Sequence, residues 1–259
     1  FSVHTLGGIL ASGNTVPIGG GFKIDLGPDI EICKGDSIIL AAPDGFETYT
    51  WSTGDTTNLI TVSSSGTYVL SVTNAGISGS DTILISVRDL PAVELGEAVN
   101  MCQGQSKQLD AGEGFASYLW NTTDTTHTLT VSSSGTFSVT VTDAFGCSNT
   151  DLVEVTVHDL PEVYLGEDKE TCFGDPVTLD AGQGFEYYEW DNGDINPSIT
   201  VTDQGLYFVT VTDSNLCSAT DSIFVTVLSL PVVSLGEDIS QPDSVIIDAG
   251  PGFVSYEWS

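Results

Sequence analysis

A repeat of about 70 residues constrains the fold of this chain more than any other feature. The positions of successive Leu-Gly pairs differ by 69, 70 and 70, and those of successive tryptophans differ by 69, 70 and 68. The leucines are Leu26, Leu95, Leu165 and Leu235, and the tryptophans are Trp51, Trp120, Trp190 and Trp258. Such self-similarity indicates an array of like structural units. We predict three complete repeats (24–90, 91–160 and 161–230), part of a fourth repeat (231–259), and an N-terminal linker or end of a preceding domain (1–23).

Apolar and polar side chains alternate along several segments of each repeat. Phe137, Val139 and Val141 are separated by Ser138 and Thr140, a period of two that is typical of a half-buried strand. Glycine, asparagine, aspartate and proline separate such segments, and no segment has helical periodicity. Six or seven short strands in each repeat favour a β-sandwich. The predicted fold class is therefore all-β, a tandem array of β-sandwich repeats.

A turn signature narrows the prediction to immunoglobulin-like sandwiches. The segment 203–207 reads Asp-Gln-Gly-Leu-Tyr, which matches the turn of a tyrosine corner, where a phenol hydroxyl ties the incoming loop to its strand. Tyr68 has the same place in repeat 1, whereas Phe137 in repeat 2 has no hydroxyl. The tryptophans of the complete repeats lie where the core tryptophan of the third strand is expected. We expect them to be buried; stacking of an exposed ring on a sugar is the alternative.

Cysteine positions also repeat. Cys102 and Cys147 are 45 residues apart, as are Cys172 and Cys217 at the equivalent positions. This spacing predicts one disulfide within each of repeats 2 and 3, and hence an oxidising compartment outside the cytoplasm. Closing such a loop removes roughly 4 kcal/mol of unfolded-chain entropy, which matters for a small sandwich core.

The first and fourth repeats depart from this cysteine pattern. Cys33 stands alone in repeat 1, with Ser78 where its partner is expected, and we predict a free thiol, with an intermolecular bridge as the alternative. Repeat 4 has no cysteine, and Gln241 is near the expected place.

The chain is strongly acidic, with 36 Asp and Glu, 5 Lys and Arg, and a formal net charge of −31. Such a surface repels phosphate backbones and anionic headgroups, so we predict neither nucleic-acid binding nor membrane insertion. Calcium is the one candidate metal, and Glu97, Asp168 and Asp238 are its candidate ligands, although no Asp-x-Asp-x-Asp-Gly loop is present. No other cofactor is expected. The three histidines lie at non-equivalent positions without zinc-ligand spacing, and we predict that the chain is not an enzyme.

The full motif combines Leu-Pro-x-Val-x-Leu-Gly-Glu-Asp, Cys-x-Gly-Asp, Leu-Asp-Ala-Gly-x-Gly-Phe, Tyr-x-Trp and Gly-x-Tyr-x-Val-x-Val-Thr-Asp. It resembles the PKD-like and immunoglobulin-like repeats of secreted Bacteroidota proteins, which include the SprB-type gliding-motility adhesins and other cargo of the type IX secretion system. The resemblance covers 24–259. It implies a long extracellular adhesin or filament at the cell surface, in which this segment is a structural stalk that projects an adhesive tip. We expect the natural polypeptide to continue beyond this segment.

The short segments that join successive repeats indicate an elongated arrangement. Leu-Pro pairs mark them at 90–91, 160–161 and 230–231, and proline favours an extended, stiff connection. We therefore predict an elongated array whose partners are neighbouring repeats of the same chain. The alternatives are a module that binds surface glycans or other cell-surface proteins, and an accessory segment of a secreted enzyme. Exposed aromatic residues of repeat 3 would mark a binding module, and the candidates are Phe173, Tyr187, Tyr188 and Phe208.

Overall fold

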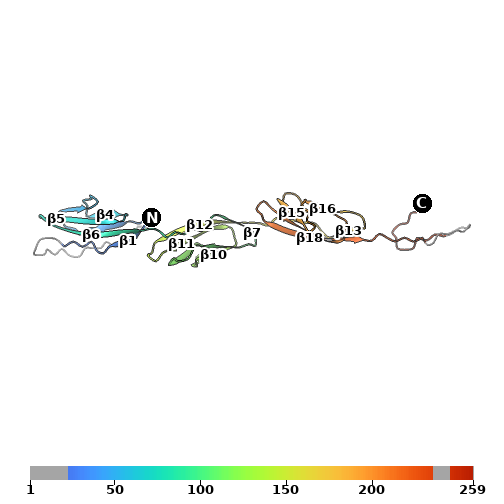
Figure 1. The fold of residues 1–259 in the computed structure, drawn as a ribbon, viewed down its shortest axis with the longest axis horizontal. Helices are drawn as coiled ribbons and strands as arrows, with labels where there is room; N and C mark the ends of the chain where they lie inside the picture. Colours follow the sequence, from blue (N-terminus) through green and yellow to red (C-terminus); the bar gives the residue numbers. More distant parts are fainter. Residues whose placement is uncertain (1–22, 236–245, 259) are drawn as a thin grey trace. The chain divides into compact units, whose positions relative to one another are not determined.

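The structure is a computed structural model that describes residues 23–235 and 246–258. Every regular element in these ranges is a β-strand (Figure 1). Repeat 1 contains β1 (Ile30–Cys33), β2 (Ile38–Ala41), β3 (Thr48–Trp51), β4 (Leu59–Val62), β5 (Gly66–Asn74) and β6 (Ile77–Arg88). Repeat 2 contains β7 (Val99–Cys102), β8 (Lys107–Asp110), β9 (Ser117–Trp120), β10 (Thr128–Val131), β11 (Gly135–Thr142) and β12 (Ser148–His158). Repeat 3 contains β13 (Lys169–Cys172), β14 (Val177–Asp180), β15 (Tyr187–Trp190), β16 (Ser198–Val201), β17 (Gly205–Thr212) and β18 (Ser218–Leu228).

The strands of each repeat form two sheets that share one core. The larger sheet of repeat 1 has the order β1-β6-β5-β3, and β2 pairs with β4 in the smaller one; repeats 2 and 3 follow the same scheme. In repeat 1 one cluster of buried side chains includes Leu40 and Ile60 from the smaller sheet and Val72 and Ile85 from the larger. Two sheets that bury their inner faces together form a sandwich. The predicted fold class, tandem immunoglobulin-like β-sandwich repeats, is confirmed.

The first strand of a repeat runs parallel to the last, a feature that positions the cysteines. In repeat 1 the register pairs Ile30 with Ile85 and Cys33 with Arg88, so β1 ends level with the end of β6. The remaining pairs of the larger sheet, β6 with β5 and β5 with β3, are antiparallel. The cysteine of the first strand therefore lies beside the C-terminal end of the last strand.

The repeated tryptophans lie in the cores, as predicted. Trp51, Trp120 and Trp190 are 2%, 1% and 1% exposed. Their ring N–H groups donate to the backbone carbonyls of Thr57, Thr126 and Asn196 at 2.9, 2.8 and 2.8 Å. Burying an indole is favourable when its N–H finds an acceptor, and each ring has one in the loop after its strand. These rings are not available for stacking on a sugar.

The tyrosine corner is present where the sequence predicted it. The hydroxyl of Tyr68 donates to the carbonyl of Ser64 at 2.9 Å, and that of Tyr207 donates to the carbonyl of Asp203 at 2.8 Å. Partial burial raises the pKa of Tyr207, and the carboxylate of Asp203 adds to the effect. The Tyr207 hydroxyl therefore remains a protonated donor at neutral pH.

A repeated aspartate ties the beginning of each repeat to its last strand, which the sequence reasoning missed. The backbone amides of the repeated leucines Leu26, Leu95 and Leu165 donate to the carboxylates of Asp81, Asp151 and Asp221 at 2.6, 2.7 and 2.7 Å. Hydrogen bonds to an ionised acceptor are stronger than neutral ones. This tether accounts for the nearly equal spacing of leucine and aspartate in the three repeats.

The described residues divide into two compact units, and the limits of these units do not coincide with the repeats. The first unit comprises the described residues up to Val99 together with Ser106–Thr156, and the second comprises Asn100–Gln105 together with the described residues from Val157 onward. The segment Asn100–Gln105 carries Cys102, which is bonded to Cys217 of the second unit.

Candidate functional site

The disulfides join neighbouring repeats, and the pairing predicted from the sequence is wrong. Cys33 of repeat 1 bonds to Cys147 of repeat 2, and Cys102 of repeat 2 bonds to Cys217 of repeat 3, each with a Cα–Cα distance of 5.5 Å. Cys33 is therefore not a free thiol. Cys172, which was expected to pair with Cys217, is the free and exposed cysteine of the described residues.

The strand arrangement explains why cysteines of one repeat cannot pair. In repeat 3, Cys172 lies level with Leu228 at the C-terminal end of β18, whereas Cys217 directly precedes Ser218 at the beginning of that strand. A strand of 11 residues spans on the order of 35 Å, and a disulfide requires Cα atoms within about 7 Å. The observed separations of 114 and 115 residues exceed the predicted spacing by one repeat length.

We call each place where an inter-repeat disulfide links two repeats a junction. One side of each junction is a hairpin that carries a cysteine. The hairpin between β11 and β12 contains Asp143, whose carboxylate accepts hydrogen bonds from the amides of Phe145 and Cys147, both at 2.9 Å. The amide of Asp143 donates to the carbonyl of Cys147 at 2.9 Å, and Gly146 supplies the left-handed conformation (φ 88°) that closes the turn. Cys147 is consequently held in one position and is 1% exposed.

The hairpin between β17 and β18 repeats this geometry with different residues at its tip. The carboxylate of Asp213 accepts from the amides of Asn215 and Cys217 at 2.9 and 2.8 Å. Leu216 stands in the place of the glycine with φ 65°, a conformation that costs a residue with a Cβ some strain. Cys217 is fully buried. The aspartate, not the glycine, is thus the common element that positions the cysteine.

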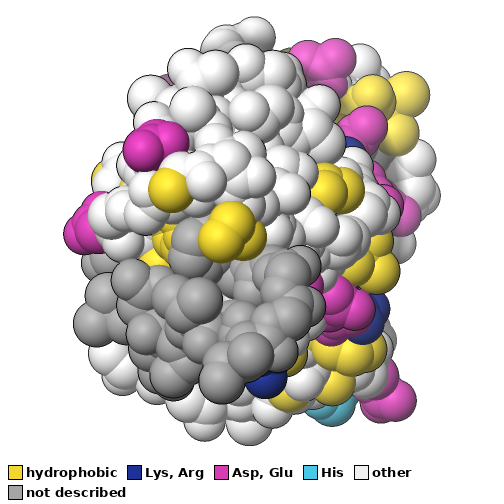
Figure 2. All heavy atoms as spheres, turned by 90° about the vertical axis from the view of Figure 1, so that its left-hand side faces the viewer, with side chains coloured by type: hydrophobic (Ala, Val, Ile, Leu, Met, Phe, Trp, Pro, Cys, Tyr) yellow, Lys and Arg dark blue, Asp and Glu magenta, His cyan; other side chains and the backbone are white. Residues whose placement is uncertain are grey.

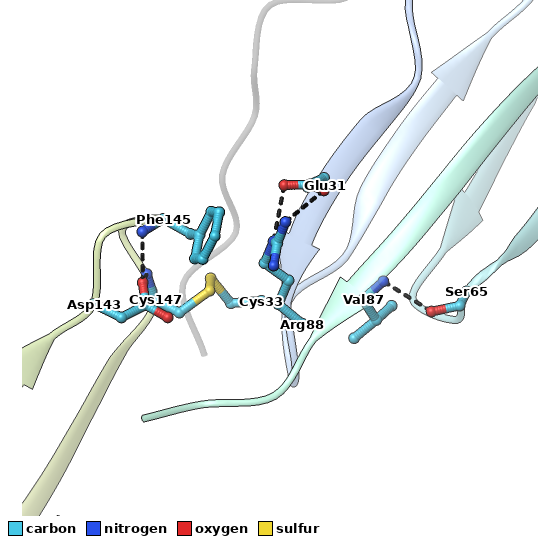
Figure 3. A network of polar contacts seen from close by, with 8 residues as sticks. All are labelled: Glu31, Cys33, Ser65, Val87, Arg88, Asp143, Phe145 and Cys147. Carbon is cyan, nitrogen blue, oxygen red and sulfur yellow. Dashed lines mark hydrogen bonds and ion pairs between the residues drawn. A yellow bond between two sulfur atoms is a disulfide. The ribbon is translucent and has the colours of Figure 1, made fainter. Parts of the chain in front are cut away.

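The other side of the first junction is the paired end of β1 and β6, shown in Figure 3 with the disulfide between Cys33 and Cys147. Arg88 forms a two-point ion pair with Glu31, with N–O distances of 2.8 and 2.7 Å. The guanidinium also lies over the ring of Phe145, 3.5 Å from its centroid (Figure 3). Hydrogen bonding to Arg88 lowers the pKa of Glu31, and the same bond to Glu31 raises the pKa of Arg88, with a smaller contribution from Asp143.

Arg88 therefore connects the two repeats beside the disulfide. It belongs to repeat 1, and through Phe145 it contacts the tip of the hairpin in repeat 2. Cations prefer the face of an aromatic ring, and an arginine that is also fixed by a carboxylate has little freedom left to lose. The covalent bond and this contact together restrict how the hairpin can turn on the end of β1 and β6.

The second junction has different side chains at the same positions. His158 replaces Arg88 and Asn100 replaces Glu31, and the His158 ring nitrogen Nε2 lies 3.1 Å from the Asn100 amide oxygen. The amide of Gln103 donates to the carbonyl of His158 at 2.7 Å, as the amide of Lys34 does to Arg88 at 2.8 Å in repeat 1. The junction thus tolerates different side chains at these positions as long as the first strand stays bound to the end of the last.

Repeat 1 has no hairpin cysteine, and the register identifies the residue in its place. Ser78 pairs with Thr73, as Ser148 pairs with Thr142 in repeat 2, so Ser78 corresponds to the residue after the cysteine. Ile77, which pairs with Asn74, has the cysteine's position. The sequence comparison misplaced it by one residue because the repeat 1 hairpin is one residue shorter.

The candidate calcium ligands do not form a cluster in the described residues. No group of three or more His, Cys, Asp or Glu side chains suited to a metal ion is present there. The carboxylate of Asp168 accepts a hydrogen bond from the amide of Phe224 at 2.9 Å, and Glu97 is exposed. Asp238 lies outside the described residues. Calcium binding at these residues stays a prediction.

The aromatic residues proposed as binding contacts divide into two groups. Tyr188 is 8% exposed and belongs to the core of repeat 3, so its prediction as an exposed residue is wrong. Phe173, Tyr187 and Phe208 are exposed. Figure 2 shows one face of the molecule, on which acidic side chains lie at several separate places and few Lys or Arg side chains are visible. No helix in the described ranges is long and apolar enough to cross a membrane.

Shared sandwich cores, tyrosine corners and disulfides between repeats define this chain as an array of covalently linked immunoglobulin-like repeats. Disulfides are typical of extracellular proteins, because the cytoplasm keeps thiols reduced. No protein-family model and no curated protein matches the chain.

Solved structures with similarity to the chain include other immunoglobulin arrays. The N-terminal eight Ig domains of Down syndrome cell adhesion molecule match with 16% identity and a TM-score of 0.34, over 77% of this chain and 34% of that one. Titin domains I67–I69 match with 15% identity and a TM-score of 0.39, over 80% and 98%. Extracellular domains 3–5 of Drosophila OTK match with 12% identity and a TM-score of 0.33, over 85% and 99%. This chain spans about a third of the length of the cell adhesion molecule fragment.

Proposed function

We propose that the chain is a structural stalk segment of a secreted cell-surface adhesin or filament, and that it is not an enzyme. The observation that carries this proposal is the pairing of the cysteines between neighbouring repeats. A disulfide inside a small domain stabilises that domain, whereas one between domains also restricts their relative motion. Covalent junctions of this kind suit a part that must transmit load over a distance.

The joins and the charge support the same function. Domains that are connected only by a chain segment move relative to one another unless their interface is large. Here each covalent junction adds a second connection to the proline-containing backbone join. A net charge of −31 also opposes folding of one repeat back onto another, within a screening length of about 10 Å.

The resemblance in sequence to the repeats of Bacteroidota adhesins extends the proposal to the cellular location and the export route of the stalk. In that setting the stalk stands on the bacterial surface, is exported by type IX secretion and carries its adhesive tip elsewhere in the protein. The disulfides support an extracytoplasmic location, since both need an oxidising compartment to form.

Small-angle scattering on the full chain tests the stalk. Three sandwiches of roughly 30–40 Å each predict a maximum dimension on the order of 100 Å. A matched control replaces all four bonded cysteines by serine. It should keep folded repeats but give a broader distribution of dimensions. A radius of gyration of about 18 Å for the oxidised chain, the value for a compact domain of this length, would overturn the proposal.

One observation favours a second function, the binding of a protein partner by repeat 3. Leu206 and Phe208 on β17 and Phe224 on β18 are exposed, and Leu206 pairs directly with Phe224 across the sheet. At the corresponding positions repeat 2 has Thr136, Ser138 and Glu154. Phe208→Ser should abolish binding if this strip is a contact surface and should leave the scattering curve unchanged.

A further inference from the structure

Cys172 occupies the position that forms an inter-repeat disulfide in both preceding repeats. Cys33, Cys102 and Cys172 are each the last residue of the first strand of a repeat. The first two bond to the hairpin cysteine of the following repeat, whereas Cys172 is free. The first-strand cysteine therefore forms a disulfide in repeats 1 and 2 but not in repeat 3.

The surroundings of Cys172 have the features of an uncovered junction. Cys33 and Cys102 are half-buried, whereas Cys172 is exposed. Its register partner Leu228 is 48% exposed, although Arg88 and His158 are half-buried at the same place. Phe173, the next residue, is 69% exposed, and its amide donates to the carbonyl of Leu228 at 2.9 Å. The end of repeat 3 thus has the backbone geometry of the other junctions with apolar side chains left in solvent.

The distribution of cysteines along the chain points to the missing partner. Repeat 1 has a first-strand cysteine but carries Ile77 in its hairpin, and repeat 4 has no cysteine before Trp258. Each disulfide joins the first strand of one repeat to the hairpin of the next repeat. If the disulfides begin with the one between repeats 1 and 2, the hairpin of repeat 1 needs no cysteine. If they end with one between repeats 3 and 4, repeat 4 needs a cysteine in its hairpin but none in its first strand.

In the part of repeat 4 that the structure describes, residues 248–256 make the loop contacts of the other repeats. Asp248 accepts a hydrogen bond from the amide of Gly250 at 2.9 Å, and the hydroxyl of Tyr256 donates to the carbonyl of Gly250 at 2.8 Å. Tyr188 and Gly182 make the equivalent contact in repeat 3 at 3.1 Å. Residues 248–256 thus form the same kind of loop as their counterparts in repeat 3. The segment that starts at Pro231 follows closely in the chain on the end of β18, beside which Cys172 lies.

We propose that Cys172 is the acceptor for a third inter-repeat disulfide, whose other half is a cysteine in the hairpin between the last two strands of repeat 4. The two thiols lose two protons and two electrons to a disulfide oxidant such as glutathione disulfide, which is reduced to two thiols. Phe173 and Leu228 become covered when the hairpin docks. The bond follows from the junctions alone and does not rely on the stalk function.

The experiment completes repeat 4 by adding a copy of residues 192–230 after Ser259 of the full chain. The protein is oxidised with a glutathione mixture, alkylated with a maleimide and mapped without reduction. The 259-residue chain should carry one alkylated cysteine, Cys172, and the completed chain none, with Cys172 linked to the copied hairpin cysteine. The matched control, in which that copied cysteine is serine, should restore alkylation of Cys172.

A second extension covers the case in which the completed repeat does not fold. Here a whole copy of repeat 3 follows Leu230, so the added unit has every strand that forms in this structure. Cys172 should again escape alkylation, and the copy of Cys172 in the added repeat should be alkylated instead. Alkylation of Cys172 in this chain, or a dimer linked through Cys172, would overturn the proposal if the disulfides of Cys33 and Cys102 have formed.

Discussion

Mechanical extension of the chain gives a quantitative test of the observed cysteine pairing. When both ends are pulled, the unfolded chain extends along its shortest covalent route. The backbone from Cys33 to Cys217 is about 184 residues long, at about 3.45 Å each when extended. The route through both disulfides runs from Cys33 to Cys147, back along the chain to Cys102, and on to Cys217, which is about 45 residues.

The oxidised chain should therefore be shorter than the reduced chain by roughly 139 residues, or about 480 Å, at full extension. Single-molecule force spectroscopy on the full chain, with and without a reductant, measures this difference. Cys33→Ser leaves only the link between Cys102 and Cys217, which hides 115 residues. The difference for this variant should fall to about 400 Å.

Pairing within the repeats predicts a different length. Bonds from Cys102 to Cys147 and from Cys172 to Cys217 would each hide about 45 residues, or about 310 Å in total. In that case Cys33→Ser would change nothing, and Cys172→Ser would halve the difference. A measured difference of about 310 Å at full extension, together with this response to the two substitutions, would refute inter-repeat pairing.

Three further outcomes follow from the junction and the cores. Arg88→Gln should return the lowered pKa of Glu31 to its ordinary range, which NMR titration can follow. Because the folded pKa is lowered, the stability that this pair contributes is present above the unfolded pKa of Glu31 and is lost as the pH falls through the folded pKa. Trp120→Ala should destabilise repeat 2 by about 3–5 kcal/mol in denaturant unfolding, because it removes a core side chain that is 1% exposed. Tyr207→Phe should cost repeat 3 about 1 kcal/mol in the same assay, by removing the hydrogen bond to Asp203.

Features that depend on one repeat at a time could be predicted from the sequence. The alternation along Phe137, Val139 and Val141 predicts the strand that the structure has as β11, with both valines fully buried. The tryptophans and the tyrosine corner were equally predictable, because side-chain size and a short turn motif determine their positions. Local pattern and local packing agree in these elements.

The cysteine pairing could not be deduced in this way. Separations of 45 and 115 residues differ by one repeat, so Cys102, Cys147 and Cys217 each have a possible partner under either scheme. Only the parallel pairing of the first strand with the last decides between them, since it places Cys172 and Cys217 at opposite ends of β18. The number of unpaired cysteines does not decide either, because Cys33 is left over under the predicted scheme and Cys172 under the observed one.

The order of the four bonded cysteines determines what a single break in the backbone does to the chain. Cys102 lies inside the loop closed by Cys33 and Cys147, and Cys147 lies inside the loop closed by Cys102 and Cys217. A single backbone cut anywhere between Cys33 and Cys217 therefore leaves both pieces joined by at least one disulfide. Under pairing within repeats, a cut at the join near Pro161 would separate the chain. Pairing between repeats thus protects the joins at 90–91 and 160–161, which are segments that a domain's own core does not protect.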